Sequence, residues 1–265
     1  MRTFYLQNAL GQKWNLNNRN SFLHDVKGLG QAHATSYTQI GNRFLEKKNS
    51  LSQKKISGKI RFRDYGEFNR FSGFVQHKPL TLIYGGMLSK EDWYPPMYPG
   101  DKSYLLDVAM ISLEKSELET GGLYSKITLE SIGTYYRMIH IASDASEIII
   151  ESDTVLECGI RIKIPGPCIN PSYTHCLNGI SKCSGLFKCV IGEGNTMVID
   201  TTKLPFEIKE YSAEGQIIRN LYGTSDFSTK RFVMLGYGTN KITFTHEGAG
   251  EIAASVEAKM EYESV

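Results

Sequence analysis

The sequence predicts a mainly β protein, with an α+β N-terminal domain containing one helix and a C-terminal β-sandwich. Three observations predict this fold. The chain contains 15 Tyr, 12 Phe and 25 Gly against 8 Pro, a composition that favours strands and turns. Only one stretch repeats its apolar residues with a helical period, whereas short apolar runs separated by turn residues recur along the chain. The two halves also differ in charge and cysteine content.

The difference in charge predicts two domains. Residues 1–137 contain 19 Lys and Arg against 12 Asp and Glu, whereas residues 138–265 contain 11 against 16. The basic excess is concentrated in residues 43–63, which hold eight bases and one acid. We therefore expect a first domain over residues 1–138 and a second over residues 139–265.

Short strands at 3–6 and 13–17 begin the first domain, and a half-buried strand is predicted at 55–63. In this last strand apolar and basic residues alternate with a period of two, which places the basic ones on the outer face. The apolar positions are Ile56, Ile60 and Phe62, and the basic positions are Lys59, Arg61 and Arg63.

One helix is predicted directly after this strand. Its apolar stripe consists of Tyr65, Phe68, Phe71, Phe74 and Val75. Asp64 is a suitable N-cap, and Glu67 completes a capping-box pattern. We expect the helix to end before Lys78-Pro79, because the residue before a proline avoids helical angles.

Strands then follow to the end of the chain. The first domain continues with strands at 80–84 and 104–113 and a hairpin that enters 123–130, and it finishes near 133–138. In the second domain, apolar runs occur at 147–151, 158–164, 173–177, 185–191, 196–200, 231–235, 240–245 and 250–262. Short strands with turn signals every eight to twelve residues are typical of a two-sheet sandwich.

Residues 22–48, "FLHDVKGLGQAHATSYTQIGNRFLEKK", match neither a helix nor a strand pattern. The fragments "GLGQAH" (28–33) and "GEGN" (192–195) resemble parts of phosphate loops, but neither is followed by GK[ST]. We interpret these glycines as turns and close backbone approaches.

No residue pattern indicates catalysis or a cofactor. The carboxylate pairs Asp64/Glu67, Glu91/Asp92 and Glu117/Glu119 are explained by a helix cap, a loop and a turn, and no GxSxG motif occurs. We expect no catalytic, cofactor-binding or metal-binding residues. No run approaches 18 apolar residues and the N-terminus does not resemble a signal peptide, so we expect no membrane span and synthesis in a cytoplasm.

The five cysteines, Cys158, Cys168, Cys176, Cys183 and Cys189, lie within one window without a CxxC pair. Zinc sites normally include such a pair, and the neighbours His175 and Cys176 would point to opposite faces of a strand. We therefore favour free, partly buried thiols over a metal site.

Two kinds of ligand remain open alternatives. The basic stretch 43–63 could contact nucleic acid, although it offers few aromatic residues for base stacking; a solvated face or a face against an acidic neighbouring subunit fits better. A β-sandwich could bind sugar, but Trp14 and Trp93 both lie in the first half. The candidate stacking rings in the second half are Tyr173, Tyr211, Tyr222 and Tyr237.

The first half contains, in this order, "GLG" (28–30), "YTQIGNRFL" (37–45), the basic "SGKIRF" strand and an aromatic helix before "PLTLIY". The second half contains "IPGPCINPSYTHCLNG" (164–179) and "IGEGNTMVIDT" (191–201). In these segments the chain resembles the distal tail proteins of siphophages, the first set resembling the family's N-terminal domain and the second its galectin-like C-terminal domain. The five cysteines match no pattern of the family.

This resemblance implies a structural role without catalysis. It implies a homo-hexameric ring between the tail tube protein and the tail-tip hub protein, with genome DNA passing through the channel. The galectin-like domains would form an outer docking platform for receptor-binding proteins of a phage or a phage-derived bacteriocin. The protein would be part of the virion tail, assembled in the bacterial host cytoplasm. The alternative is a baseplate protein that binds host cell-wall polysaccharide.

A closed ring requires head-to-tail contacts between subunits. Our hypothesis is that residues 22–48 form an inter-subunit arm, with the basic strand 55–63 in or beside the contact. The residues expected at this interface are Phe22, Leu29, Tyr37, Ile40, Phe44, Lys59, Arg61 and Arg63.

Overall fold

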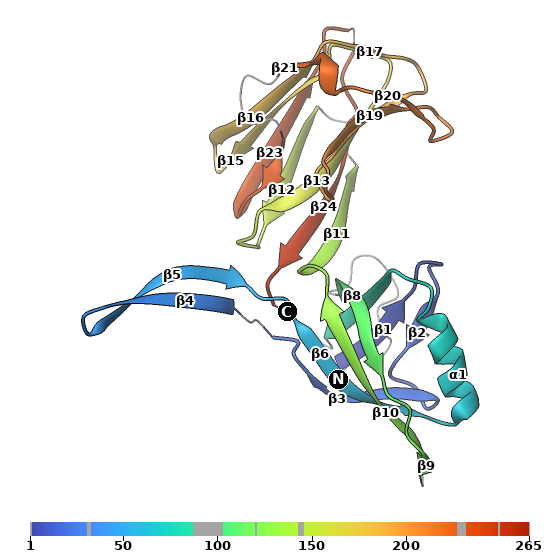
Figure 1. The fold of residues 1–265 in the computed structure, drawn as a ribbon. Helices are drawn as coiled ribbons and strands as arrows, with labels where there is room; N and C mark the ends of the chain where they lie inside the picture. Colours follow the sequence, from blue (N-terminus) through green and yellow to red (C-terminus); the bar gives the residue numbers. More distant parts are fainter. Residues whose placement is uncertain are drawn as a thin grey trace. The chain divides into compact units, whose positions relative to one another are not determined.

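The structure is a computed structural model that describes residues 2–30, 33–86, 103–119, 121–142, 146–226, 232–248 and 250–264. It is mainly β, as predicted, with one α-helix among these residues. Two compact units divide the chain (Figure 1): residues 1–136 with 263–265, and residues 137–262. None of the helices in the described ranges has the length and apolar character that crossing a membrane requires.

Among its described residues, the first unit contains eleven strands or strand portions and the α-helix. Its elements are β1 (Arg2–Gln7), β2 (Lys13–Asn15), β3 (Ser21–Lys27), β4 (His33–Ile40), β5 (Arg43–Leu51), β6 (Lys55–Phe62), α1 (Tyr65–Phe74), β7 (Leu80–Gly86), β8 (Ser103–Leu113), β9 (Leu118–Glu119), β10 (Gly122–Ser131) and the start of β11 (Tyr135–Ala142). The predicted loop "WYPPMYPGD" and residue Trp93 lie outside the described residues.

Antiparallel pairing joins most of these strands in the order β2-β1-β7-β8-β10-β6-β3. The chain between β2 and β3 turns back on itself through a bridge between Asn17 and Phe22. The alternation predicted for the basic strand is confirmed, because Ile56, Ile60 and Phe62 of β6 are buried. The apolar inner face therefore forms the core of this unit, and the basic residues of β6 face outwards.

Helix α1 packs against the aromatic side of this core. Asp64 is the N-cap, and its carboxylate accepts a hydrogen bond of 2.8 Å from the Glu67 N–H, as predicted. The ring of Phe71 lies 5.3 Å from those of Trp14 and Phe62. The helix ends at Phe74, earlier than the predicted end before Lys78, because the chain leaves helical geometry through turns that precede the proline.

The second unit is a β-sandwich of two antiparallel sheets. Its elements are the rest of β11, β12 (Glu147–Ser152), β13 (Cys158–Pro165), β14 (Cys168–Ile169), β15 (Ser172–Leu177), β16 (Ile180–Phe187), β17 (Val190–Ile191), β18 (Thr196–Asp200), β19 (Glu207–Tyr211), β20 (Ile217–Asn220), the 3-10 helix η1 (Tyr222–Thr224), β21 (Ser225–Asp226), β22 (Met234–Leu235), β23 (Gly238–Thr245) and β24 (Ser255–Tyr262).

One sheet of the sandwich has the order β24-β13-β18-β19-β20, and the other β12-β23-β15-β16-β21. Their inner faces form one continuous apolar core that includes Ile160, Tyr173, Phe244 and Val256. The strands β14, β19 and β20 were not predicted. β14 has only two residues, and β20 is exposed along its whole length. β19 alternates charged with apolar residues, but over only five positions.

Candidate subunit interface

The strands β4 and β5 form a hairpin of their own, residues 33–51 (Figure 1). They pair with each other from His33↔Leu51 to Ile40↔Arg43, and with no other described strand. Every residue from 33 to 47 is exposed. The hairpin therefore takes almost none of its stability from the core of its own unit, and an isolated two-stranded hairpin is only marginally stable in water.

The hairpin corrects the expectation that residues 22–48 contain no strand. Residues 21–27 form β3, which pairs with β6, and only the following segment leaves the sheet. Gly41-Asn42 is the two-residue turn, and Gly41 has a φ of +60°, which a type II′ turn requires at this position. The Gly-Asn pair between "YTQI" and "RFL" is the sequence signal that could have predicted this hairpin.

Apolar side chains occupy both faces of the hairpin. Directly paired residues share a face, and the register joins Thr38 to Leu45 and Gln39 to Phe44. Ile40 and Leu45 therefore lie on one face, whereas Tyr37 and Phe44 lie on the other. These four side chains are 55–67% exposed. A strand pair without a buried face shows no alternation of apolar and polar residues, which explains why the sequence did not predict these two strands.

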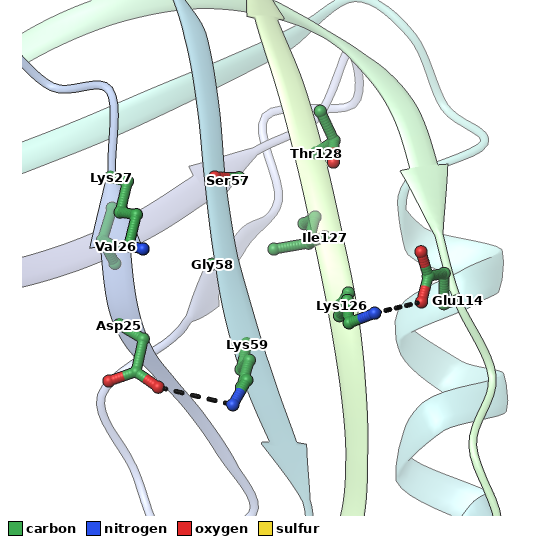
Figure 2. A pocket seen from close by; sticks show the side chains of 10 residues that line it. All are labelled: Asp25, Val26, Lys27, Ser57, Gly58, Lys59, Glu114, Lys126, Ile127 and Thr128. Carbon is green, nitrogen blue, oxygen red and sulfur yellow. Dashed lines mark ion pairs between the residues drawn. The ribbon is translucent and has the colours of Figure 1, made fainter.

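Strand β6 places Lys59 beside a hollow in the outer face of the sheet. The hollow measures about 580 Å³ and is lined by residues of β3, β6 and β10 and by Glu114, directly after β8 (Figure 2). Lys59 Nζ lies 3.7 Å from a carboxylate oxygen of Asp25, and Lys126 Nζ lies 3.4 Å from one of Glu114. Because these lysines face carboxylates, the hollow presents mixed charge rather than the uniform positive charge that suits a phosphate backbone.

The structure separates the eight predicted interface residues into three groups. Tyr37, Ile40 and Phe44 lie on the hairpin. The other exposed or half-exposed members, on or directly after β3 and β6, are Phe22, Lys59, Arg61 and Arg63. Phe22 is directly paired with Arg61 in the register of β3 and β6.

Leu29 differs from these seven residues, and its inclusion in the predicted interface is corrected. It is buried in the core of its own unit, where its carbonyl accepts a hydrogen bond of 3.1 Å from the Tyr135 hydroxyl. Its side chain is therefore not available to a neighbouring subunit. Leu45, which was not predicted, has the exposure that Leu29 lacks.

The glycines of the phosphate-loop fragments have structural roles. Gly28 has a φ of +83°, and a Cβ at this position would lie 2.0 Å from the Lys55 carbonyl oxygen, so the two backbones approach closely. Gly194 also has a positive φ, of +77°, within the turn between β17 and β18. Gly28 therefore lies at a close backbone approach and Gly194 in a turn, as the sequence predicted.

The cysteines are free thiols, four of them buried and Cys176 half-buried. Burial raises the pKa of Cys168 to about 11, with the nearby Cys189 as a smaller cause. His175 is buried on β15, and its Nδ1 lies 3.9 Å from the sulfur of Cys183 on the paired strand β16. Across the part of the chain that the structure describes, no three His, Cys, Asp or Glu side chains are grouped to hold a metal ion.

The tyrosines considered for sugar binding differ in exposure. Tyr173 is buried in the sandwich core, which removes it as a stacking surface. Tyr211 and Tyr222 are half-buried, and Tyr222 donates a hydrogen bond to the Phe206 carbonyl. Tyr237 is exposed. No group of exposed aromatic rings therefore forms from these four residues.

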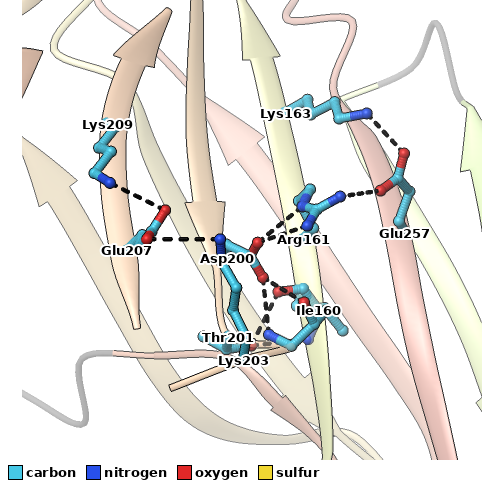
Figure 3. Close-up of polar contacts among 10 residues, drawn as sticks. Ile160, Arg161, Lys163, Asp200, Thr201, Lys203, Glu207, Lys209 and Glu257 are labelled. Carbon is cyan, nitrogen blue, oxygen red and sulfur yellow. Dashed lines mark hydrogen bonds and ion pairs between the residues drawn. The ribbon is translucent and has the colours of Figure 1, made fainter. Parts of the chain in front are cut away.

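The outer face of the sandwich sheet β24-β13-β18-β19 contains a network of opposite charges (Figure 3). Arg161 lies 2.8 Å from Asp200 and 3.0 Å from Glu257, which also lies 2.6 Å from Lys163. Although burial opposes it, hydrogen bonds from Thr202 and Arg161 lower the pKa of Asp200. The charges neutralise one another across the strands, which stabilises the sheet.

Comparison with known proteins agrees with the sequence resemblance. Residues 3–132, about half of the chain, match the family model of the distal tail protein, N-terminal domain. No curated protein matches the chain.

Solved structures show the same fold over the whole length. A chain of the phage P2 baseplate in its activated conformation with Ca is 14% identical, with a TM-score of 0.65 and coverage of 100% of both chains. The crystal structure of the Dit protein of phage SPP1, described as a paradigm of the hub adsorption apparatus in phages infecting Gram-positive hosts, is 8% identical. Its TM-score is 0.67, with coverage of 98% of this chain and 99% of that one.

The family match covers the unit that holds the hairpin and the basic strand, and the similarity in fold extends through the sandwich. The chain therefore belongs to the distal tail proteins of bacteriophages, which are structural components of the virion tail tip.

Proposed function

We propose that this chain forms a hexameric ring that links the tail tube to the tail-tip hub. Genome DNA passes through the channel, and the sandwich domains serve as an outer docking platform for receptor-binding proteins. The chain catalyses no reaction in this role, and rings assemble in the host cytoplasm before they become part of the virion. Membership of the distal tail protein family and the likeness in fold to baseplate and hub proteins support this proposal.

The β4–β5 hairpin is the observation on which the proposal mainly rests. Its two faces expose Tyr37 and Phe44 on one side and Ile40 and Leu45 on the other. Burying such side chains contributes about 1.5–3 kcal/mol each. A neighbouring subunit that covers both faces therefore supplies the packing that the hairpin lacks in its own unit. A head-to-tail contact of this kind generates a ring when the rotation closes.

The basic face of β6 extends the proposed contact. Lys59 is exposed beside the hollow and Arg63 is exposed directly after β6, with Arg61 and its paired residue Phe22 between them. The mixed charges of the hollow suit a polar rim around an apolar centre, the usual organisation of a protein interface. In the proposed ring the hairpin supplies the apolar centre and this face the rim.

Removal of the hairpin tests the proposal. Residues 34–50 are replaced by Asn-Gly, which joins the paired residues His33 and Leu51 through a two-residue turn. A deletion over 24–42 would be unsuitable, because it removes half of β3 and damages the sheet. We expect the shortened chain to fold with unchanged circular dichroism beyond the lost strands. Native mass spectrometry should find it as a monomer under conditions in which the intact chain forms rings.

Paired substitutions separate the two faces of the hairpin. Tyr37→Ser with Phe44→Ser removes one apolar face, and Ile40→Ser with Leu45→Ser removes the other. Either pair should weaken assembly at least about a hundredfold if the side chains are buried between subunits. Leu10→Ser, an equally exposed apolar residue of the same unit outside the hairpin, is the matched control and should have no effect. Rings of normal stability without the hairpin would contradict the proposal.

A further inference from the structure

Lys54 is buried, although it lies in the segment between the hairpin and β6 where the next residue, Lys55, is exposed. Its exposed fraction is only 3%. Lysines are almost never fully buried unless their charge is compensated. The position is also notable, because the hairpin ends at Leu51 and β6 begins at Lys55.

The ammonium group of Lys54 has a partner in each of three directions. It donates a hydrogen bond of 3.0 Å to the carbonyl of Gly30 and another to the carbonyl of Glu263, which belongs to the same unit. It also lies 5.5 Å from the centre of the Tyr135 ring, within the range of a cation–π interaction. Two hydrogen bonds to carbonyls and one aromatic ring therefore compensate the buried charge.

The same contacts join both ends of the hairpin. The Tyr135 hydroxyl donates to the Leu29 carbonyl, and Leu29 and Gly30 lie shortly before His33, the first residue of the hairpin. On the other side, the Lys54 N–H donates to Ser131 Oγ at 2.8 Å, and the Ser131 N–H donates to the Lys54 carbonyl at 2.9 Å. Lys54 therefore connects the segment before the hairpin, at Gly30, with β10 and with Glu263.

We propose that Lys54 is a positioning residue that fixes the direction of the β4–β5 hairpin, with Gly30, Tyr135 and Glu263 as its partners. This inference rests on the proposed function, since direction matters only if the hairpin binds a neighbouring subunit. Residues 33–47 of the hairpin are all exposed, so its orientation is set where it leaves the sheet. A hairpin held in its bound direction loses less conformational freedom on assembly, which strengthens the contact.

Hydrogen exchange and assembly measured on the full-length chain test the inference. Lys54→Met keeps an unbranched apolar stem of similar length but removes the ammonium group with all three donors. We expect amides in 27–33 and 51–57 to exchange at least about tenfold faster, with β7 and β8 unchanged. The concentration at which rings form, followed by native mass spectrometry, should rise at least about tenfold. Lys55→Met, at the exposed neighbouring position, is the matched control and should change neither quantity.

Tyr135→Phe provides a second, milder variant, which removes only the hydroxyl that binds the Leu29 carbonyl. It should speed hydrogen exchange in 27–33 by a smaller factor. If Lys54→Met does not fold, the exchange measured on Tyr135→Phe tests the positioning role instead. Unchanged exchange in either folded variant would overturn the inference, and so would faster exchange with normal assembly. If the chain without the hairpin still forms rings, the proposed function itself fails. If that chain stays monomeric but Lys54→Met assembles normally, only the positioning role of Lys54 fails.

Discussion

The buried carboxylate of Asp200 allows a quantitative test of the charge network in the sandwich. Its side chain is 3% exposed and accepts a hydrogen bond of 2.9 Å from Arg161 Nε, and Arg161 Nη2 lies 2.8 Å from the same carboxylate as an ion pair. Thr202 donates two more, from its N–H at 2.9 Å and its hydroxyl at 2.6 Å. Arg161→Met removes the cation and leaves the carboxylate buried.

The expected loss follows from these contacts. Breaking a buried ion pair by removing one partner costs about 3–5 kcal/mol. Arg161 is about one-third exposed and Asp200 keeps its bonds from Thr202, so solvent and these donors reduce the loss. We therefore expect Arg161→Met to lower the free energy of unfolding of the second unit by about 2–3 kcal/mol. This corresponds to roughly a 30- to 150-fold increase in its opening equilibrium.

The stability loss caused by Arg161→Met should depend on pH in a defined direction. The pKa of Asp200 is lowered in the folded protein, so its charge stabilises the fold above the ordinary pKa of about 3.9. That contribution is lost as the pH falls through the lowered pKa. The difference between wild type and Arg161→Met should therefore be largest near neutral pH and should shrink below about pH 4.

Hydrogen exchange of peptides from β13 and β18, measured across a urea series, reports the stability of this unit separately from the first. Lys209→Met is the control, because its partner Glu207, at 3.2 Å, is 21% exposed whereas Asp200 is 3% exposed, and it should cost less than about 1 kcal/mol. The double variant Arg161→Met with Asp200→Asn should regain part of the loss. A loss from Arg161→Met that is no larger than the control's, or one that grows in acid, would refute this reasoning.

Three further predictions concern the stability of each unit. Phe71→Ala should destabilise the first unit by about 3–5 kcal/mol and shift the fluorescence of Trp14, whose ring it contacts; an unchanged denaturation midpoint would contradict the packing. Asp64→Ala should cost about 1 kcal/mol through the lost helix cap, whereas Asp64→Asn should cost less; equal losses in calorimetry would exclude capping as the cause. Burial lowers the pKa of His175, against the hydrogen bond to Asn240, so the second unit should lose stability as the pH falls below about 6.5; His175→Gln should remove this slope, and a slope that persists would assign it to another group.

The elements that could be predicted from the sequence are those with one buried face. Ile56, Ile60 and Phe62 alternate with basic residues because β6 covers a core on one side only, and the stripe from Phe68 to Phe74 marks the buried side of α1. The same reasoning predicted most strands of the sandwich, whose inner positions form a single apolar core. The charge difference between the halves indicated two domains.

The β4–β5 hairpin was not predicted, for a physical reason. A two-stranded ribbon exposed on both faces has no alternating apolar pattern, so only the Gly41-Asn42 turn indicated it. The burial of Leu29, shortly before the hairpin, could not be predicted from the neighbouring residues in the sequence.

By itself the sequence determined the β-rich class and the helix with its cap, because these depend on local periodicity and composition. The quoted motifs supplied the family resemblance, and the charge difference between the halves predicted two domains. Only the tertiary structure decided that Lys54 is buried beside Gly30, Tyr135 and Glu263, and that Arg161 lies between Asp200 and Glu257. These contacts join residues far apart in the chain, and strand pairing, which local sequence does not encode, brings them together.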